Sequence, residues 1–356
     1  MNTPLRTARA AEQGNTILLA AITIVGLIGI GAFAVDIGSA LVTKTELQNT
    51  SDAASLSGAL ELGRIYSELG PGVSFKDYTL TSGDKSRIQA KIGAFSVANR
   101  AGGVAVEELS SDTVFGKYDS GAGTIVAADT GVKAVKVKAR RDATANGTMS
   151  TTLGRVLGIN TLSAAATSGA GLSSIGGVKS GGLGIPVGIA ETWFQHHTCQ
   201  VTPEIQFYPT GSSCAGWHTY TEAPASASRL GSILRGLKAG TYQSPASSVG
   251  STYYNFTGGT LASVFDDMKA LYEANKDASG VWDVLLPVYA SDDCGNPSGS
   301  IQIVGYAKAA ITAVTDAPAK TITGLVKCGV LTSGDGVTGG GTSDYGTLYG
   351  SPGMLQ

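Results

Sequence analysis

The N-terminal part of the chain contains a long apolar segment. Residues 16–35 read TILLAAITIVGLIGIGAFAV and carry no charge, and a helix of this length, rising about 1.5 Å per residue, crosses a hydrocarbon layer of roughly 30 Å. The pattern predicts a transmembrane helix over residues 15–35. Its large apolar side chains are Ile17, Leu18, Leu19, Ile22, Ile24, Val25, Leu27, Ile28, Ile30, Phe33 and Val35.

The charges beside this segment predict its orientation. Arg6 and Arg9 precede it and Asp36 follows it, so the positive-inside rule places residues 1–14 in the cytoplasm and the rest of the chain outside. A cleaved secretory signal is the alternative interpretation, because Ala32-Phe33-Ala34 is of the type that signal peptidases cut. The apolar run exceeds a usual signal core, which favours a retained anchor.

The helical pattern continues beyond the apolar segment. One stripe recurs at spacings of three, four or seven residues, as expected for one face of a helix, and its small residues permit close approach of a partner. We therefore expect one long helix that leaves the membrane. The stripe consists of Ala40, Leu47, Ala54, Gly58, Leu62, Ile65 and Leu69.

The pattern over residues 36–175 predicts a helix extension joined to an α+β module. Ile88, Ile92 and Phe95 share one face of a predicted amphipathic helix that stops by Gly102. In the segment from Lys133 to Arg140 the apolar positions Val135, Val137 and Ala139 alternate with basic ones, as in a half-buried strand. The other expected elements are strands at 104–109, 113–118 and 162–167 and a short helix at 150–157 ended by Gly158.

A second, strand-rich domain is expected over residues 183–331. The stretch 171–184 is rich in Gly and Ser, a composition that favours a flexible boundary. Residues 332–356 form a Gly-rich tail that either wraps the domain or stays mobile. The fold class is thus α+β, and the expected elements of this domain are strands at 185–190, 281–289 and 301–314 and helices at 228–237 and 261–271.

A motif around the apolar segment resembles the N-terminal signature of the Flp pilus-assembly TadE/TadG-like (Tad) family. The likeness covers about 45 residues, and its core is the run LQNTSDAASLSGA after the apolar anchor. The resemblance implies a single-pass inner-membrane protein of a pilus or secretion machine, with most of the chain in the periplasm. The matching positions are Gly14, Asp36, Gly38, Leu47, Gln48, Asp52, Ala53 and Ala54.

Two features depart from related chains. Some TadG-like proteins carry a von Willebrand type A domain with an Asp-x-Ser-x-Ser metal loop, and this sequence has no such loop, so no metal site of that kind is expected. Prepilins carry Gly before the cleaved bond and Glu five residues beyond it. Gly14 is present, but Leu19 occupies the Glu position, and processing at Gly14 is an open alternative.

All four cysteines, Cys199, Cys214, Cys294 and Cys328, follow residue 190. Because an extracytoplasmic location permits oxidation, we predict two disulfides. Three pairings are open, and the shorter separations favour Cys199 with Cys214 and Cys294 with Cys328. The rival interpretation is a zinc site, since His196, His197 and His218 lie near the first two cysteines, but the spacing lacks a C-x-x-C knuckle.

Other polar clusters point to ordinary surfaces. The basic residues Lys133, Lys136, Lys138, Arg140 and Arg141 are expected on a solvated strand face and not at a phosphate-binding site. The segment that contains Asp292, Asp293 and Asn296 lacks the spacing of a calcium loop, and a turn is expected there. The sequence contains no nucleophile elbow, P-loop, HExxH or dinucleotide fingerprint.

Composition narrows the class of function. The chain has 356 residues, with 25 Lys and Arg against 27 Asp and Glu, so its net charge of -2 provides no field for nucleic acid. Its 50 glycines indicate many turns. We expect a non-enzymatic, cofactor-free protein in the inner membrane whose partners are lipid and other Tad pilus proteins, and which can self-associate through small residues such as Gly26, Gly29 and Gly31.

Two alternatives stay open. One is a pseudopilin or filament subunit processed near Gly14, whose apolar helix would pack in a filament core. The other is a secreted or anchored enzyme or glycan-binding module in the C-terminal part, suggested by Trp193, Trp217, Trp282 and many Tyr residues that could line a sugar site.

Overall fold

The computed structural model describes residues 5–69, 73–119, 121–196, 214–258, 261–316, 318–332, 334, 336–341 and 343–355. The chain divides into two compact units. Unit 1 comprises Met1–Ser57, Gln89–Val114 and Lys136–Gly169, and unit 2 comprises Gly58–Ile88, Phe115–Val135 and Ala170–Gln356.

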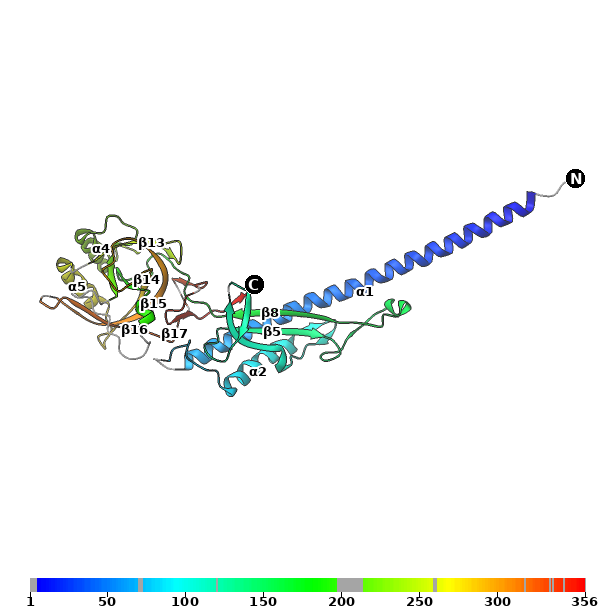
Figure 1. Ribbon diagram of the computed structural model, residues 1–356, viewed down its shortest axis with the longest axis horizontal. Coiled ribbons are helices and arrows are strands. Elements are labelled where there is room, and N and C mark those ends of the chain that lie inside the picture. Colours follow the sequence, from blue (N-terminus) through cyan, green and yellow to red (C-terminus); the bar gives the residue numbers. More distant parts are fainter. Residues whose placement is uncertain are drawn as a thin grey trace. The chain divides into compact units, whose positions relative to one another are not determined.

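The first element is one continuous helix, α1 (Leu5–Glu68), drawn in blue in Figure 1. No proline occurs between Pro4 and Pro71, so every backbone N–H in this stretch can donate within a helix. Thr43 and Thr50 donate their hydroxyls to carbonyls four residues earlier, at 2.9 and 2.8 Å. The structure confirms that the apolar helix continues as a helix beyond residue 35, to Glu68.

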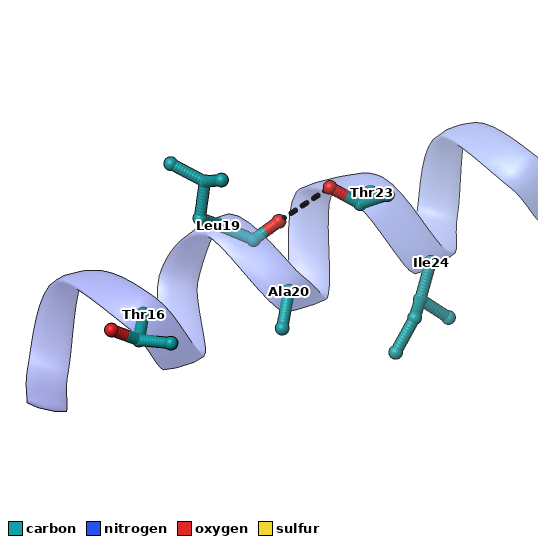
Figure 2. Close-up of a pocket in the computed structure, with 5 residues that line it drawn as sticks. All are labelled: Thr16, Leu19, Ala20, Thr23 and Ile24. Carbon is teal, nitrogen blue, oxygen red and sulfur yellow. Dashed lines mark hydrogen bonds between the residues drawn. The ribbon is translucent and has the colours of Figure 1, made fainter.

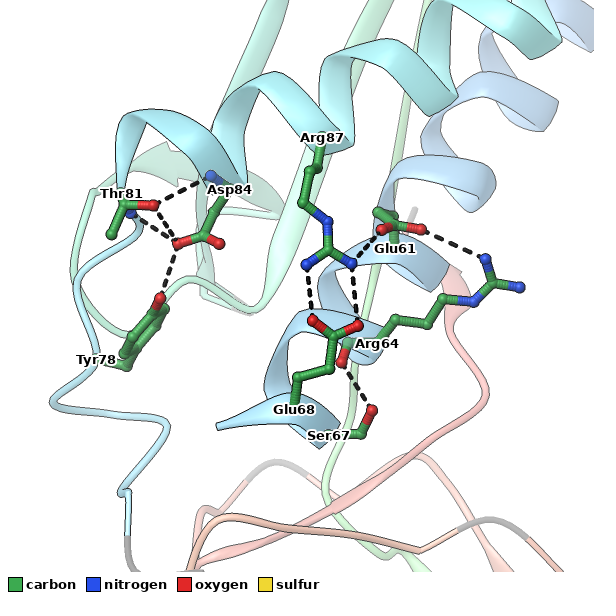
Figure 3. A network of polar contacts seen from close by, with 8 residues as sticks. All are labelled: Glu61, Arg64, Ser67, Glu68, Tyr78, Thr81, Asp84 and Arg87. Carbon is green, nitrogen blue, oxygen red and sulfur yellow. Dashed lines mark hydrogen bonds and ion pairs between the residues drawn. The ribbon is translucent and has the colours of Figure 1, made fainter. Parts of the chain in front are cut away.

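The second helix, α2 (Ser82–Ala98), begins at a capping box. Within unit 2, the Asp84 carboxylate accepts the backbone N–H of Thr81 at 2.9 Å, and the Thr81 hydroxyl accepts the N–H of Asp84 at 3.1 Å. Arg87 then donates to Glu61 and Glu68 of α1 at 2.8 and 2.7 Å, as Figure 3 shows. These ion pairs hold the start of α2 to the end of α1.

A five-stranded sheet follows, in the order β20-β8-β5-β3-β4. Its middle strand confirms the predicted alternation, because Val135, Val137 and Ala139 are fully buried. The strands are β3 (Thr113–Asp119), β4 (Thr124–Ala127), β5 (Ala134–Arg141), β8 (Ala164–Gly171) and β20 (Gly353–Leu355).

Short elements complete this part of the fold. The core of unit 1 contains Leu47 of α1 beside Ala101, Val106, Ala139 and Ala166. The predicted short helix is a 3-10 turn that ends at a left-handed glycine, Gly158, with φ 81°. These elements are β1 (Arg100–Ala101), β2 (Val104–Ala105), η1 (Ser110–Asp112), β6 (Met149–Ser150), η2 (Gly154–Leu157) and β7 (Thr161–Leu162).

One predicted core position in α2 is wrong. Ile88 and Ile92 are buried at 0% and 1% exposure, but Phe95 is 49% exposed. From Ile88 to Phe95 the helix turns by about 700°, which rotates Phe95 some 20° off the Ile88 direction and Ile92 by about 40° the other way. The buried stripe instead continues on the Ile92 side to Ser96, which is 0% exposed. Ser96 lies about 100° from Phe95 around the helix, so Phe95 falls outside the stripe.

Unit 2 is built on a mixed sheet in the order β13-β11-β10-β14-β15-β16. Strand β10 pairs in parallel with β14 and antiparallel with β11, and the long strands β14 and β15 form an antiparallel pair with a bulge after Val288. The strands are β10 (Val187–Ala190), β11 (Ala215–His218), β13 (Tyr253–Thr257), β14 (Trp282–Tyr289), β15 (Gly299–Thr315) and β16 (Thr321–Lys327).

Helices of unit 2 contribute Leu230, Leu234, Phe265 and Met268 to the same core as this sheet. Helix α4 begins at Ser226, whose hydroxyl accepts the N–H of Arg229, and ends at Gly240. Both predicted helices of this region are therefore present. The helices are α3 (Trp193–His196), α4 (Ala227–Ala239), η3 (Ala262–Val264) and α5 (Phe265–Asn275).

The Gly- and Ser-rich stretch 171–184 differs from the expected flexible boundary. It contains β9 (Gly177–Val178), which pairs with β12 (Ser247–Ser248) on one side and β18 (Val337–Thr338) on the other. Its apolar residues Leu172, Ile175, Val178 and Leu183 are buried. A Cβ on Gly176 would lie 2.5 Å from the Gly339 carbonyl oxygen, so glycine serves close backbone packing here and not flexibility.

The described part of the tail wraps unit 2. Strand β19 (Thr347–Tyr349) pairs in parallel with β17 (Val330–Thr332). Leu348 is fully buried, and the Tyr345 hydroxyl donates to Glu191 at 2.8 Å. Of the two options that composition left open for this segment, the structure shows wrapping.

Candidate functional site

The first part of α1 has an exposed apolar surface. Among the described residues, one helix is long and apolar enough to cross a membrane, and it includes residues 16–35. All eleven large apolar side chains of the predicted span are exposed, from 48% for Phe33 to 71% for Ile17. Soluble proteins rarely leave so continuous an apolar surface in water.

One surface of this segment combines small, hydroxyl and large apolar side chains. Thr16, Leu19, Ala20, Thr23 and Ile24 lie along it, as Figure 2 shows. The Thr23 hydroxyl donates to the Leu19 carbonyl at 2.8 Å. This bond satisfies the hydroxyl inside its own helix, so the threonine does not require water.

Asp36, the first residue after the span, binds a backbone loop. Its Oδ1 accepts the N–H of Thr152 at 2.7 Å, and its Oδ2 accepts those of Leu153 at 3.0 Å and Gly154 at 2.7 Å. The bonds from Thr152 and then Gly154 hold the pKa of Asp36 below its ordinary value of 3.8. Asp36 is 8% exposed, and the charge of its carboxylate is compensated by peptide dipoles.

A second polar contact joins α1 to β8 within unit 1. Gln48 donates its amide to the Ser168 hydroxyl at 2.7 Å and to the Asp52 carboxylate at 2.8 Å. The Ser168 hydroxyl also donates to Asp52, and lies 2.9 Å from the hydroxyl of Ser51. One serine of the strand therefore contacts three polar side chains within two turns of the helix.

Apolar residues of the sequence motif lie in the same region of α1, and some of them are buried. Leu47 and Ala54 are fully buried, while Ala53 and Gly38 are partly exposed. Gly14 lies before the part of α1 whose side chains are described. Asp36, Leu47, Gln48, Asp52 and Ala54 thus position the α+β module on the helix, and we refer to them as the motif face.

Two polar groups support this module, of which the sequence placed Arg141 in solvent and did not indicate the other. Arg141 is 7% exposed and donates to the carbonyls of Ala101 and Gly102 at 3.0 and 3.1 Å. The expected solvated position is therefore wrong for Arg141. Arg140 pairs with Asp112 at 2.9 Å. Arg141 continues the buried register of β5, two residues after Ala139. It also donates to the carbonyls of the following turn, Asn146, Gly147 and Thr148.

Glu108 is the second of these groups. Its Oε1 accepts a bond of 3.4 Å from Ser96, while its buried Oε2 has no partner. Burial, and then the nearby Asp112, raises the pKa of Glu108 from 4.5 to about 7. A carboxyl that titrates near neutral pH therefore lies within unit 1.

The disulfide pairing differs from the prediction. Cys214 and Cys294 form a disulfide across 80 residues, with their Cα atoms 4.1 Å apart. Strand β10 lies between β11 and β14, antiparallel to one and parallel to the other, so the start of β11 and the end of β14 meet at one edge. Pairing by shortest separation is thus wrong, because the sheet and not the loop length sets the distance. Cys199 lies outside the described residues.

The zinc interpretation loses one of its ligands. Cys214 is oxidised, and a disulfide sulfur does not bind zinc as a thiolate does. His218 is fully buried, and its Nδ1 accepts the N–H of Tyr220 at 3.3 Å. His196 and His197 lie outside the described side chains. Within the described ranges, no group of three His, Cys, Asp or Glu side chains has the geometry to hold a metal ion.

The remaining candidate clusters have structural roles. At the expected turn, Asp293 accepts the N–H of Gly295 at 2.9 Å, which confirms a turn. Trp193, Trp217 and Trp282 are at most 9% exposed and belong to the core of unit 2. They offer no exposed ring face on which a sugar could stack.

Unit 2 contains a cavity of about 430 Å³ with a positive lining. Lys76, Lys117 and Lys133 line it, and Asp344 pairs with Lys133 at 2.7 Å. Three ammonium groups against one carboxylate suit an anionic group. No sequence pattern indicates this cavity, because its lysines come from segments far apart in the chain.

Comparison with known proteins supports an assignment for the N-terminal segment. The family described as Putative Flp pilus-assembly TadE/G-like (Tad) matches residues 14–61. No curated protein and no solved structure matches the chain. The matched segment contains the apolar span and the whole motif face. Residues 14–61 are thus similar to Flp pilus-assembly proteins of the TadE/G-like family, and the resemblance inferred from the sequence is confirmed over this segment.

Proposed function

We propose that this protein is a non-enzymatic, single-pass inner-membrane component of Tad/Flp pilus assembly. Residues 15–35 anchor it, and units 1 and 2 present surfaces to other pilus proteins in the periplasm. The observation that carries the proposal is the match of residues 14–61 to a pilus-assembly family, within which the motif face joins an exposed apolar helix to a folded module.

Two further observations support this placement. Arg6 and Arg9 precede the span, which favours a cytoplasmic N-terminus. The disulfide between Cys214 and Cys294 suits an oxidising compartment. A non-enzymatic role agrees with the structural use of the polar clusters, because Asp36, Asp52, Arg141 and Asp293 are engaged with backbone or neighbouring side chains.

Topology is tested with a membrane-impermeant thiol reagent on cells whose outer membrane is permeabilised and whose inner membrane is intact. Val126→Cys lies on an exposed strand position, at 53% exposure, and Thr7→Cys lies in the basic N-terminus. We expect V126C to be labelled while the inner membrane is intact, and T7C to be labelled only after the inner membrane is lysed. The reverse pattern would overturn the proposed orientation.

The role in pilus assembly is tested by deleting the protein and counting surface pili by electron microscopy. We expect pili to be lost and to return with the full-length chain. Unchanged piliation would refute the assignment. The intact mass of the native chain separates the anchor from the alternatives, since loss of the residues up to Gly14 would indicate a processed filament subunit and loss up to Ala34 an exported protein.

A further inference from the structure

The hairpin that Asp36 binds has an unusual surface for a water-exposed loop. Strands β6 and β7 pair at Met149 with Leu162 and at Ser150 with Thr161. At the tip, Val156 is 82% exposed and Ile159 is 42% exposed. Arg155 is the one charged residue between Met149 and Leu162. The tip therefore presents apolar side chains beside a single cation.

Hydrogen bonds within the turn order the backbone of this tip. The Ile159 N–H donates to the Gly154 carbonyl at 2.9 Å, and the Thr151 hydroxyl donates to the Ile159 carbonyl at 2.5 Å. Gly158 closes η2 in the left-handed region. The backbone of the tip is thus held by a hydrogen-bonded turn, and within this turn Val156 and Ile159 are exposed.

The position of the tip along α1 is set by Asp36. Three backbone N–H groups of residues 152–154 bind a carboxylate that directly follows the span. The apolar surface of α1 continues past this point, since Ile37, Leu41 and Val42 are 42%, 60% and 59% exposed. The next charged residue is Lys44. With residues 15–35 across a bilayer, as proposed above, the hairpin would lie close to the level where the helix leaves it.

We propose that the tip of the β6–β7 hairpin, residues 151–160, is a second membrane contact. Val156 and Ile159 enter the headgroup and acyl boundary of the periplasmic leaflet, and Arg155 pairs with lipid phosphate. Asp36 positions the hairpin and, bound to three N–H groups, presents no free carboxylate to the phosphates. This inference rests on the proposed anchoring by residues 15–35.

The contact is tested by fluorescence in vesicles of phosphatidylethanolamine and phosphatidylglycerol. The full chain carries an environment-sensitive label at Val156→Cys, and nitroxide groups near the headgroups of the lipid act as quenchers. Val126→Cys in unit 2, also exposed, is the matched control, and Ile24→Cys with a deep nitroxide reports the anchor. The described cysteines are disulfide-bonded, and the wild-type chain gives the labelling background.

We expect a blue-shifted, strongly quenched label at Val156 and an unquenched one at Val126. Adding Asp36→Asn should reduce quenching at Val156 and leave Ile24 unchanged. If Ile24 is quenched and Val156 is not, the hairpin contact is refuted and the anchor stands. Equal quenching at Val156 and Val126 would also refute it, as general adsorption. If Ile24 is not quenched, the anchor fails and this inference fails with it.

Discussion

At the residue scale, Asp36 has the clearest role. A carboxylate accepts three backbone N–H groups best when it is ionised, and its pKa is held below 3.8 for that reason. Because the folded-state pKa is lowered, the stabilisation is present above the pKa of the unfolded chain and is lost as the pH falls through the folded-state value.

We expect Asp36→Asn to weaken the attachment of the hairpin at neutral pH. An asparagine has one acceptor oxygen in place of two, and its NH₂ group faces a donor. Limited proteolysis of the detergent-solubilised protein should show faster cleavage within residues 149–162, and the difference from wild type should shrink at acid pH. Asp266→Asn, the same change at an exposed position of α5, is the control; equal cleavage in D36N and wild type would contradict this role.

The contribution of Glu108 to folding stability has the opposite pH dependence. Its pKa rises from 4.5 in an ordinary setting to about 7 in the folded protein, so folding favours the protonated form. The penalty for burying its charge is absent below about 4.5, grows as the pH rises towards 7 and is complete above it.

We therefore expect Glu108→Gln to raise the melting temperature above pH 7 and to have little effect near pH 4.5. Differential scanning fluorimetry across this range measures it. Glu107→Gln, at the exposed neighbouring position, should leave the pH profile of wild type unchanged. A stabilisation by E108Q that is constant with pH would show that protonation is not its cause.

At the element scale, residues of the motif face attach α1 to the rest of unit 1. Leu47 is fully buried against Ala139 and Ala166, while Gln48 and Asp52 bind β8 beside it. The same helix thus exposes its large apolar residues as far as Val42 and buries most of them from Leu47 onward.

Leu47→Ala is expected to destabilise the protein by about 2–5 kcal/mol, since it opens a cavity in a small core. Leu60→Ala, at a position of α1 that is 48% exposed, should change stability by less than about 0.5 kcal/mol. Urea denaturation of the solubilised full chain, followed by circular dichroism, compares the two. Equal effects would mean that Leu47 does not hold the module.

At the scale of the whole molecule, the disulfide between Cys214 and Cys294 joins the residue before β11 to the loop between β14 and β15. Breaking it in Cys214→Ser/Cys294→Ser should cost roughly 2–5 kcal/mol of folding free energy. The unfolding transition of unit 2 reports this loss by tryptophan emission, since its core contains Trp193, Trp217 and Trp282. Ser228→Ala, at an exposed position of α4, serves as control, and an unchanged transition in the double variant would contradict a stabilising role.

Local pattern predicted elements well and their partners poorly. The span, α2, β5 and α4 follow from periodicity, because each buries one face of a regular element or, in the span, exposes a continuous apolar one. Strand β14 follows from a nearly continuous apolar run, which is buried on both faces. The Cys214 pairing and the lysine-lined cavity depend on segments distant in sequence. The Gly-rich stretch was misjudged because composition alone does not separate a flexible glycine from one that permits close backbone packing, as at Gly176.

The place of β20 in the five-stranded sheet has a consequence for biogenesis. Strand β20, residues 353–355, pairs with β8, residues 164–171. The ribosome therefore synthesises β8 long before β20. During synthesis the edge of β8 therefore stays open while all of the intervening chain is produced, and an open edge is where strands of other chains can add. We therefore expect the five-stranded sheet to be completed late in folding, and a chaperone that shields a strand edge would act in that interval.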